Sequence, residues 1–352
     1  MSQNLTAAQT FWNKKIQLPY VMIIFIFSLL ALAIGQYTLG GFHRPDPAPI
    51  IVQSDNCPPP PITRYRLNDY QFTHPLLLTD RMEESKDMMG LKNEISLMIN
   101  QWKSSGQITS ASVYVRSLND NKWISINPDV TFNPGSLIKV PIMMTYLREA
   151  EKNPSLLNKK LTLDPSVKVP VQTYTEDRIV AGKAYTIKEL LYYMIAKSDN
   201  FATYLLNNNV NVPEFQKLFT DVGMEKPDVH SLDFRITASD YSKFFRMLYN
   251  ATYINNEDAD FALKLLTQSD FAEGMLKQIP AQIKVAHKFG EWGDAKDGTN
   301  HQLHETGIIY YNDSPILVTV MTKGTNVNVL PQIISEISKR IFDKLSMEQQ
   351  KS

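Results

Sequence analysis

The sequence has little cysteine, little histidine and no excess of charge of either sign. One of its 352 residues is a cysteine, Cys57, which excludes a disulfide within the chain. The polar run Ser54-Asp55-Asn56 before it is not a lipid-attachment signal, so a free surface thiol is the simplest interpretation, with pairing of two chains as the alternative. Thirty-six basic residues balance 36 acidic ones, so we expect no nucleic-acid partner.

Charge is also absent from one long stretch near the N-terminus. Residues 16–42 contain no charged side chain, and Lys14 and Lys15 precede them. About 20 apolar residues suffice to cross a bilayer, and positive charge stays on the cytoplasmic side. We therefore expect a cytoplasmic tail (1–17), a single-pass membrane anchor (18–42) and an extracytoplasmic remainder. A cleaved signal peptide is the alternative, because Ala31-Leu32-Ala33 resembles a cleavage site.

Residues 43–80 have the composition of an extracytoplasmic linker. Seven prolines fall between positions 45 and 61, a density that favours an extended and semi-rigid spacer. The apolar patch 72–78 is expected to dock onto the body of the protein. The remaining residues, 81–346, belong to a chain that is 43% hydrophobic, which is enough for a sizeable core. We interpret them as the functional domain.

Periodicity within this domain predicts an α+β fold. Apolar residues at helical spacing predict a helix over 84–104, and alternation predicts strands over 110–118 and 122–126. A capping box, Thr186 with Glu189, opens a helix that ends at 197, and a looser cap opens another over 237–248. Three more strands (283–290, 305–311 and 316–322) and a last helix (330–345) follow. The expected architecture is an antiparallel five-stranded sheet flanked by helices, with an all-helical lobe inserted between its strands.

A serine and a lysine form the first candidate site. In Asn133-Pro134-Gly135-Ser136-Leu137-Ile138-Lys139, a turn is followed by an apolar, helix-competent run. Residues three apart on a helix share a face, so the Lys139 amine would lie against the Ser136 hydroxyl. Apolar neighbours favour burial of Lys139, which would lower its pKa toward that of a useful base. Alone, the pair also fits an ordinary N-cap serine with a solvated lysine.

Two further motifs follow in order: Ser198-Asp199-Asn200 and Lys288-Phe289-Gly290. The set S-x-x-K, S-D-N and K-T-G is that of serine β-lactamases and penicillin-binding proteins. From about Glu84 to its end, the chain therefore resembles the class A β-lactamase and D-alanyl-D-alanine peptidase superfamily. The resemblance implies a serine hydrolase that forms an acyl-enzyme at Ser136 with β-lactams or cell-wall peptides, and the expected anchor would hold it at a membrane.

The resemblance also implies roles for the other motif residues. Ser198 would relay a proton to the leaving nitrogen, and Asn200 would bind the substrate amide. Lys288 would attract the substrate carboxylate and tune Ser198. The backbone N–H of Glu291, after Gly290, would complete the oxyanion site.

Two departures from the family pattern matter. Phe289 replaces the hydroxyl residue of the third motif, which removes a donor to the substrate carboxylate. The E-x-x-L-N motif that supplies the deacylating glutamate of class A β-lactamases is absent, and the nearby acids Glu225, Asp228 and Asp233 lie outside any such motif. We therefore expect slow deacylation.

Three functional alternatives remain open at this stage. The protein is a β-lactamase-like hydrolase, a D,D-carboxypeptidase or esterase without useful β-lactamase activity, or a non-catalytic cell-wall-binding module of the same fold. A metal site built from His287, His301 and His304 with Asp294 and Asp297 is disfavoured, because the pattern spreads these residues over a strand and a polar loop. We expect no metal and no cofactor.

Overall fold

The structure, a computed structural model, describes residues 62–68, 71–170, 172–176, 178–228, 233–293 and 300–349. All described residues belong to one compact unit, residues 60–352. The expected tail, the expected anchor, the expected proline-rich spacer and Cys57 lie outside the described residues. Within the ranges just given, no helix is both long enough and apolar enough to cross a membrane.

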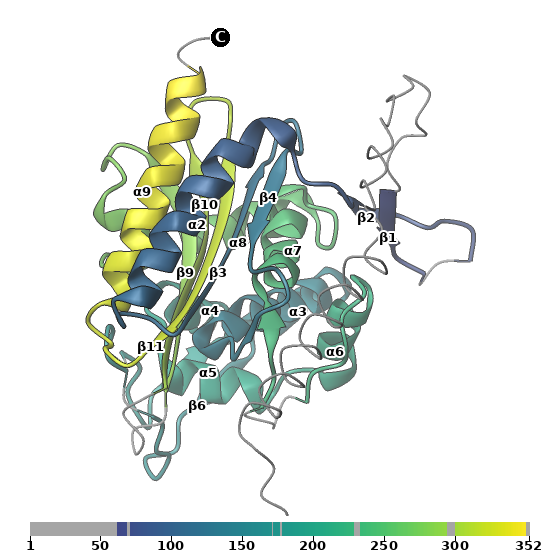
Figure 1. Cartoon of the computed structure of the whole chain (residues 1–352). Helices are drawn as coiled ribbons and strands as arrows, with labels where there is room; N and C mark the ends of the chain where they lie inside the picture. Colours follow the sequence, from purple (N-terminus) through teal and green to yellow (C-terminus); the bar gives the residue numbers. More distant parts are fainter. Residues whose placement is uncertain are drawn as a thin grey trace, which may run out of the picture. The chain divides into compact units, whose positions relative to one another are not determined.

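The core element is one antiparallel sheet of five strands, in the order β4-β3-β11-β10-β9 (Figure 1). This confirms the predicted α+β fold and its sheet. Strands that are neighbours in the sheet come from distant parts of the sequence: Tyr114 of β3 pairs with Thr319 of β11. The five strands are β3 (Ser110–Ser117), β4 (Trp123–Ile126), β9 (Lys284–Trp292), β10 (His301–Tyr310) and β11 (Ile316–Gly324).

Helices cover both faces of the sheet (Figure 1). Successive side chains of a strand point to opposite faces, so Val113 and Val115 enter one buried apolar cluster while Tyr114 enters the other. The first cluster packs beneath α2 (Met89–Ser104) and α9 (Leu330–Gln349). The second joins the sheet to the helical lobe. The site described below lies on the lobe side.

The helical lobe is inserted between β4 and β9, as predicted. Polar N-cap residues begin most of its helices: Thr186 forms the predicted capping box with Glu189, and Asp199, Asn211 and Asn255 cap three others. The lobe helices are α3 (Lys139–Lys152), α4 (Ile187–Ala196), α5 (Asn200–Asn207), α6 (Val212–Thr220), α7 (Ala238–Tyr249) and α8 (Asn256–Leu266).

Two small sheets accompany the lobe. One pairs β5 (Thr131–Phe132) with β8 (Ile236–Thr237), and the other pairs β6 (Lys160–Thr162) with β7 (Ala184–Thr186). Both are antiparallel and carry the chain into and out of the lobe helices.

The end of the segment interpreted as linker forms a hairpin. Strand β1 (Ile62–Arg66) pairs with β2 (Leu76–Arg81). Leu77 and Leu78 are buried in the lobe-side cluster, as expected of the apolar patch, whereas Phe72 is 87% exposed. Asp80 accepts a hydrogen bond of 2.6 Å from Arg246 of α7, which fastens the hairpin to the domain. Residues before the predicted boundary at residue 81 therefore pack onto the domain.

Element boundaries differ from prediction where long-range contacts decide them. The helix expected from residue 84 starts with a 3₁₀ turn, Lys86–Met88, and becomes α-helical at Met89. Strand β10 begins at His301, four positions before the predicted Glu305. Its polar start continues the sheet because Gln302 pairs with Trp292 of β9 and with Lys323 of β11.

Candidate active site

Ser136 lies on a tight turn that leads directly into a helix. The turn is a 3₁₀ helix, Gly135–Ile138, and α3 begins at Lys139. Ser136 is therefore at the start of a helical segment as predicted, but its first turn is 3₁₀ rather than α. Lys139 is only 2% exposed among the apolar residues that flank it. The predicted burial of this amine is confirmed.

Two glycines allow this turn to press against strand β9. Gly135 has a φ of +51°, and a Cβ there would overlap the carbonyl oxygen of Glu291. A Cβ on Gly290 would overlap the carbonyl oxygen of Pro134 and lie 2.8 Å from the backbone nitrogen of Leu137. Only glycine fits at these close backbone approaches. The close packing of Gly290 against the turn thus fixes the position of the first motif relative to the third.

Side chains of β10 support the turn by hydrogen bonds to the backbone of Asn133. The Asn133 N–H donates to Gln302 Oε1 (3.1 Å), and its carbonyl accepts from His304 Nε2 (3.0 Å). His304 Nδ1 accepts from the N–H of Thr322 (3.2 Å), so the proton of the neutral ring is on Nε2. Burial lowers the pKa of His304 to about 4. Neutral His304 is therefore part of the support under Ser136.

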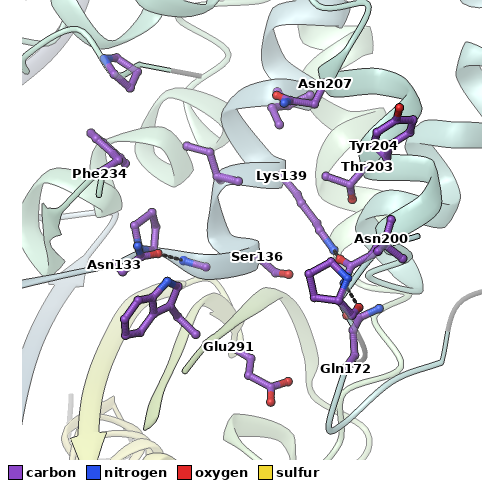
Figure 2. A pocket seen from close by; sticks show the side chains of 18 of the residues that line it. Asn133, Ser136, Lys139, Gln172, Asn200, Thr203, Tyr204, Asn207, Phe234 and Glu291 are labelled. Atoms are coloured by element: carbon purple, nitrogen blue, oxygen red, sulfur yellow. Dashed lines mark hydrogen bonds between the residues drawn. The ribbon is translucent and has the colours of Figure 1, made fainter. Parts of the chain in front are cut away.

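The Lys139 amine faces the second motif. Its Nζ donates to the carbonyl oxygen of Ser198 (2.5 Å), to Ser198 Oγ (3.1 Å) and to Asn200 Oδ1 (2.9 Å). In Figure 2 the hydroxyl of Ser136 points toward the ends of Lys139 and Asn200. The structure therefore gathers Ser136, Lys139, Ser198 and Asn200 at one place, although the start of α3 and the start of α5 come from different parts of the chain.

Ser198 is held in an unusual backbone conformation. Its φ is +52°, which side-chain-bearing residues rarely adopt, and it is 1% exposed. The next residue, Asp199, caps α5 by accepting from the N–H of Ala202 (2.7 Å). Its other carboxylate oxygen accepts from the N–H groups of Arg178 and Ile179, the latter at 2.9 Å. Asp199 is thus the anchor of the motif, and Ser198 and Asn200 present the polar groups.

Lys288 reaches Ser198 from the sheet. Its Nζ donates to Ser198 Oγ (2.9 Å) and to the carbonyl oxygen of Phe289 (2.9 Å), and the side chain is fully buried. Burial, together with the nearby Lys139, holds the pKa of Lys288 well below its usual range, and Glu305 opposes that shift. Ser198 Oγ consequently lies between two amines.

These residues border a pocket of 660 Å³ (Figure 2). Of the predicted site residues, Ser136, Lys139, Asn200 and Glu291 line it, whereas Ser198, Lys288 and Gly290 lie behind its wall. The amine expected to attract a substrate carboxylate is therefore one layer below the surface. Sequence reasoning missed several lining residues, namely Lys168, Pro170, Gln172, Tyr204, Asn207, Phe215, Phe234 and Trp292.

Most of these missed residues had no local signal, because they come from loops and helices brought in by the fold. Trp292 is the exception. It follows Gly290 by two positions on the same strand, so strand alternation alone places it on the same face.

Glu291 has a second role that its sequence position did not indicate. Its carboxylate accepts hydrogen bonds from the N–H (3.0 Å) and the Oγ1 of Thr173. Thr173 belongs to the segment 172–176, and Asn200 Nδ2 donates to the carbonyl of nearby Pro170 (3.0 Å). Strand β9 thus holds Thr173, and the second motif holds Pro170, which lines the pocket. The predicted role of the Glu291 N–H as an oxyanion donor stays a prediction.

The aromatic residue of the third motif faces away from the pocket. Phe289 is 1% exposed and lies on the α2/α9 side of the sheet. Its ring stacks on Phe271, with centroids 4.3 Å apart, and meets the edge of Tyr174 at 6.3 Å. The substitution removes a hydroxyl from the motif and places an apolar ring in the core.

One of the three acids considered for deacylation borders the pocket. Asp228 lines it, whereas Glu225 and Asp233 line a separate pocket of 500 Å³ that Asp228 also borders. Asp233 pairs with Arg235 at 3.6 Å, with its side chain 89% exposed. Among these three residues, only Asp228 is placed to meet a bound substrate.

The histidines do not converge. His287 Nδ1 lies 2.6 Å from Glu305 Oε1, and because side chains alternate along β10, His304 points to the opposite face. Asp294 and Asp297 lie outside the described residues. Elsewhere in the described part of the chain, no group of three or more metal-ligating side chains is close enough to hold an ion.

Comparison with known proteins is consistent with this geometry. The sequence model of the beta-lactamase enzyme family matches residues 90–345. β-Lactamase VEB-1 of Pseudomonas aeruginosa is 24% identical over 64% of this chain and 82% of its own length. A β-lactamase of Bacteroides uniformis is 23% identical over 74% of this chain and 93% of its own.

Solved structures share the fold. A β-lactamase from Chitinophaga pinensis superposes with a TM-score of 0.63 and 20% identity, covering 72% of this chain and all of its own. The protein PBP-A gives a TM-score of 0.63 with 17% identity, covering 74% and 97%. One structure of a PBP-A mutant is an acyl-enzyme complex with penicillin G.

Proposed function

The chain belongs to the β-lactamase enzyme family, and from that membership we propose that it is a serine hydrolase acylated at Ser136 by β-lactams or D-Ala-D-Ala-type cell-wall peptides. The observation that carries the proposal is the hydroxyl of Ser198 between the amines of Lys139 and Lys288, beside Ser136. Such an arrangement can move a proton from the nucleophile to a leaving nitrogen.

In the proposed reaction, Ser136 Oγ attacks the carbonyl carbon and its proton passes to Lys139 Nζ. Two ammonium groups on one oxygen repel each other, which favours loss of one proton and so supplies a neutral amine. The C–N bond then breaks, and the nitrogen receives a proton through Ser198. Water hydrolyses the resulting ester and frees Ser136.

We propose that this last step is slow. Class A β-lactamases use the glutamate of E-x-x-L-N to activate the water, and this sequence has no such motif. Asp228 lines the pocket but belongs to no E-x-x-L-N pattern. This absence also favours the second candidate function, a D,D-carboxypeptidase for which β-lactams are inhibitors rather than substrates.

A pulse of reporter penicillin, removal of the excess and intact-mass spectra over time test the proposal, with Ser136→Ala as the blank. We expect one adduct on the wild-type chain and none on the variant. Lasting adduct with release of D-alanine from a cell-wall peptide favours the carboxypeptidase, and rapid turnover favours a β-lactamase. A folded wild-type chain with neither adduct nor hydrolysis contradicts both, leaving a binding module.

We further propose that residues 18–42 anchor the protein in a membrane with the catalytic domain outside the cytoplasm. The uncharged run after Lys14 and Lys15 supports this orientation. Protease added to intact spheroplasts should degrade the domain and spare the N-terminal tail. Degradation only after lysis contradicts the orientation, and a mature N-terminus near Ile34 indicates a cleaved signal peptide instead.

A further inference from the structure

A buried glutamate and histidine lie on the face of the sheet opposite the pocket. Glu305 of β10 and His287 of β9 have side chains 0% and 1% exposed, with 2.6 Å between Oε1 and Nδ1. The second carboxylate oxygen of Glu305 accepts from the N–H of Met275 (2.7 Å). No part of the proposed acylation uses this pair.

The backbone leaves room for the pair at two glycines. A Cβ on Gly274 would overlap Glu305 Oε2, and a Cβ on Gly307 would lie 2.9 Å from the His287 Cβ. A fully buried carboxylate costs free energy unless it is compensated, and a hydrophobic pair of similar volume would often be at least as stable. The pair is therefore a built feature whose charge needs an explanation.

The free nitrogen of His287 indicates which partner carries the charge. His287 Nε2 is buried and has no hydrogen-bond partner. In the neutral ring with its proton on Nδ1, Nε2 is a bare acceptor. An imidazolium ring would instead bury an unpaired N–H donor with a charge, which costs more. Neutral His287 donates to Glu305, so the carboxylate keeps its full negative charge.

This negative charge lies on the face of the sheet opposite the Lys288 side chain. In the register of β9 and β10, Glu305 is opposite Phe289 and Thr306 is opposite Lys288, so the two charged residues are diagonal neighbours on opposite faces. Among the described residues, Lys288 takes part in no ion pair, and both hydrogen bonds of its amine go to neutral oxygens. Glu305 is its nearby counter-charge.

We propose that Glu305, with its charge fixed by His287, is a positioning residue that keeps Lys288 cationic from behind the sheet. The inference rests on the proposed function, in which cationic Lys288 donates to Ser198 and draws in a substrate carboxylate. The charged groups of the described residues that bear on Lys288 are Lys139 from α3, which disfavours its proton, and Glu305 from β10, which favours it. The groups in direct contact with its amine, namely Ser198, the Phe289 carbonyl and the face of the Phe289 ring (4.2 Å to its centroid), carry no net charge.

Two substitutions separate charge from packing. Glu305→Gln keeps the shape and an acceptor for the Met275 N–H but removes the charge. Glu305→Asp keeps the charge but shortens the side chain, so it leaves a packing defect. A purely structural role predicts that Asp is the more damaging change. The counter-charge predicts that only Gln changes the titration of Lys288.

The direct measurement is ¹³C NMR of the full-length protein in detergent micelles, with lysines labelled at Cε and the Lys288 resonance assigned by its loss in Lys288→Arg. We expect Glu305→Gln to lower the titration midpoint of Lys288 by about one pH unit or more. Glu305→Asp should leave it within a few tenths of wild type. An unchanged midpoint in Gln, or equal shifts in Gln and Asp, overturns the inference.

A second measurement connects the pair to acylation. When the rate of penicillin labelling is plotted against pH, the alkaline limb of the profile should shift to lower pH in Glu305→Gln, by as much as the NMR midpoint. It should stay in place in Glu305→Asp. An unmoved limb in Gln contradicts the link to the reaction. If the wild-type chain is not labelled at any pH, the proposed function fails, whereas the NMR titration still decides the charge relation.

Discussion

Lys139 and Lys288 donate hydrogen bonds to the same oxygen, Ser198 Oγ, at 3.1 and 2.9 Å. One comes from α3 and the other from β9, and both are buried. Two protonated amines beside one hydroxyl repel each other, so the site favours a state in which one of the two amines has lost its proton. That shared oxygen makes the individual roles of the two lysines testable.

The first test replaces Lys139 by arginine. Lys139→Arg keeps the positive charge but cannot deprotonate near neutral pH. If Lys139 is the base, penicillin labelling of Ser136 should slow by about 10²- to 10⁴-fold, as for loss of a general base. Stopped-flow labelling and a circular dichroism spectrum measure rate and folding. Near-normal labelling would falsify the assignment.

Ser198 offers a comparison of backbone strain with hydroxyl chemistry. Ser198→Ala and Ser198→Gly both remove the acceptor of the two amines, so both should label slowly. Because φ is +52°, glycine relieves a cost of about 1 kcal/mol that alanine keeps. Urea unfolding should therefore find Ser198→Gly more stable than Ser198→Ala by that amount. Equal stabilities would mean that the strain is released elsewhere.

Deacylation is expected to be limited by the absent glutamate. Losing a general base slows a step by about 10²- to 10⁴-fold, so a release of ~10 per second would stretch to between ten seconds and many minutes. Asp228→Asn should lengthen the lifetime of the adduct further, because Asp228 borders the pocket. Asp233→Asn is the matched control, since Asp233 is exposed and lines the other pocket. Equal adduct lifetimes in the two variants would remove Asp228 from the reaction.

The low pKa of His304 predicts that the folded protein loses stability in mild acid. Its pKa is about 4 in the folded protein against 6.5 in the unfolded chain, so the unfolded chain binds more protons between these values. The free energy of unfolding should therefore fall by about 3 kcal/mol as the pH drops from 6.5 to 4, with no further loss from this residue below that. His304→Gln should have a flatter profile over the same window. Parallel profiles would mean that other groups cause the acid sensitivity.

Two glycines allow a paired test of close packing. Gly290→Ala places a Cβ against the Pro134 carbonyl, so it should displace the turn, destabilise the domain by about 1–3 kcal/mol and slow labelling. Gly90→Ala has open space around it in α2, so it should stabilise by about 0.5–1 kcal/mol and leave labelling unchanged. Thermal unfolding and labelling rates of both variants check this. Normal labelling in Gly290→Ala would show that the turn tolerates the shift.

Local signals predicted the parts of the structure that local interactions form. The capping box of Thr186 and Glu189 is one, because both hydrogen bonds lie within a single helical turn. The turn at Gly135 and Ser136 is another, although its 3₁₀ character depends on contact with β9. Helix α5 was missed because it is eight residues long and follows α4 almost directly.

Contacts between distant segments decided what the sequence could not indicate. In the sequence, Phe289 is only a departure from a motif. In the structure, its ring stacks on Phe271, which is distant in the chain. The support of Asn133 by Gln302 and His304 spans about half of the chain, and no sequence pattern around Gln302 or His304 indicates it. Glu291 was singled out for its N–H, whereas its carboxylate bonds to Thr173 through the fold.

Strand order also has a consequence for the synthesis of this protein. Strand β3, close to the start of the domain, pairs with β11, close to its end, and the N–H of Thr109 donates to the carbonyl of Lys323. A chain growing from its N-terminus cannot complete this ladder until residue 324 has left the ribosome. Pairings of such long range fold slowly. Nascent chains that stop before β11 should contain Ser136 and yet resist labelling by penicillin.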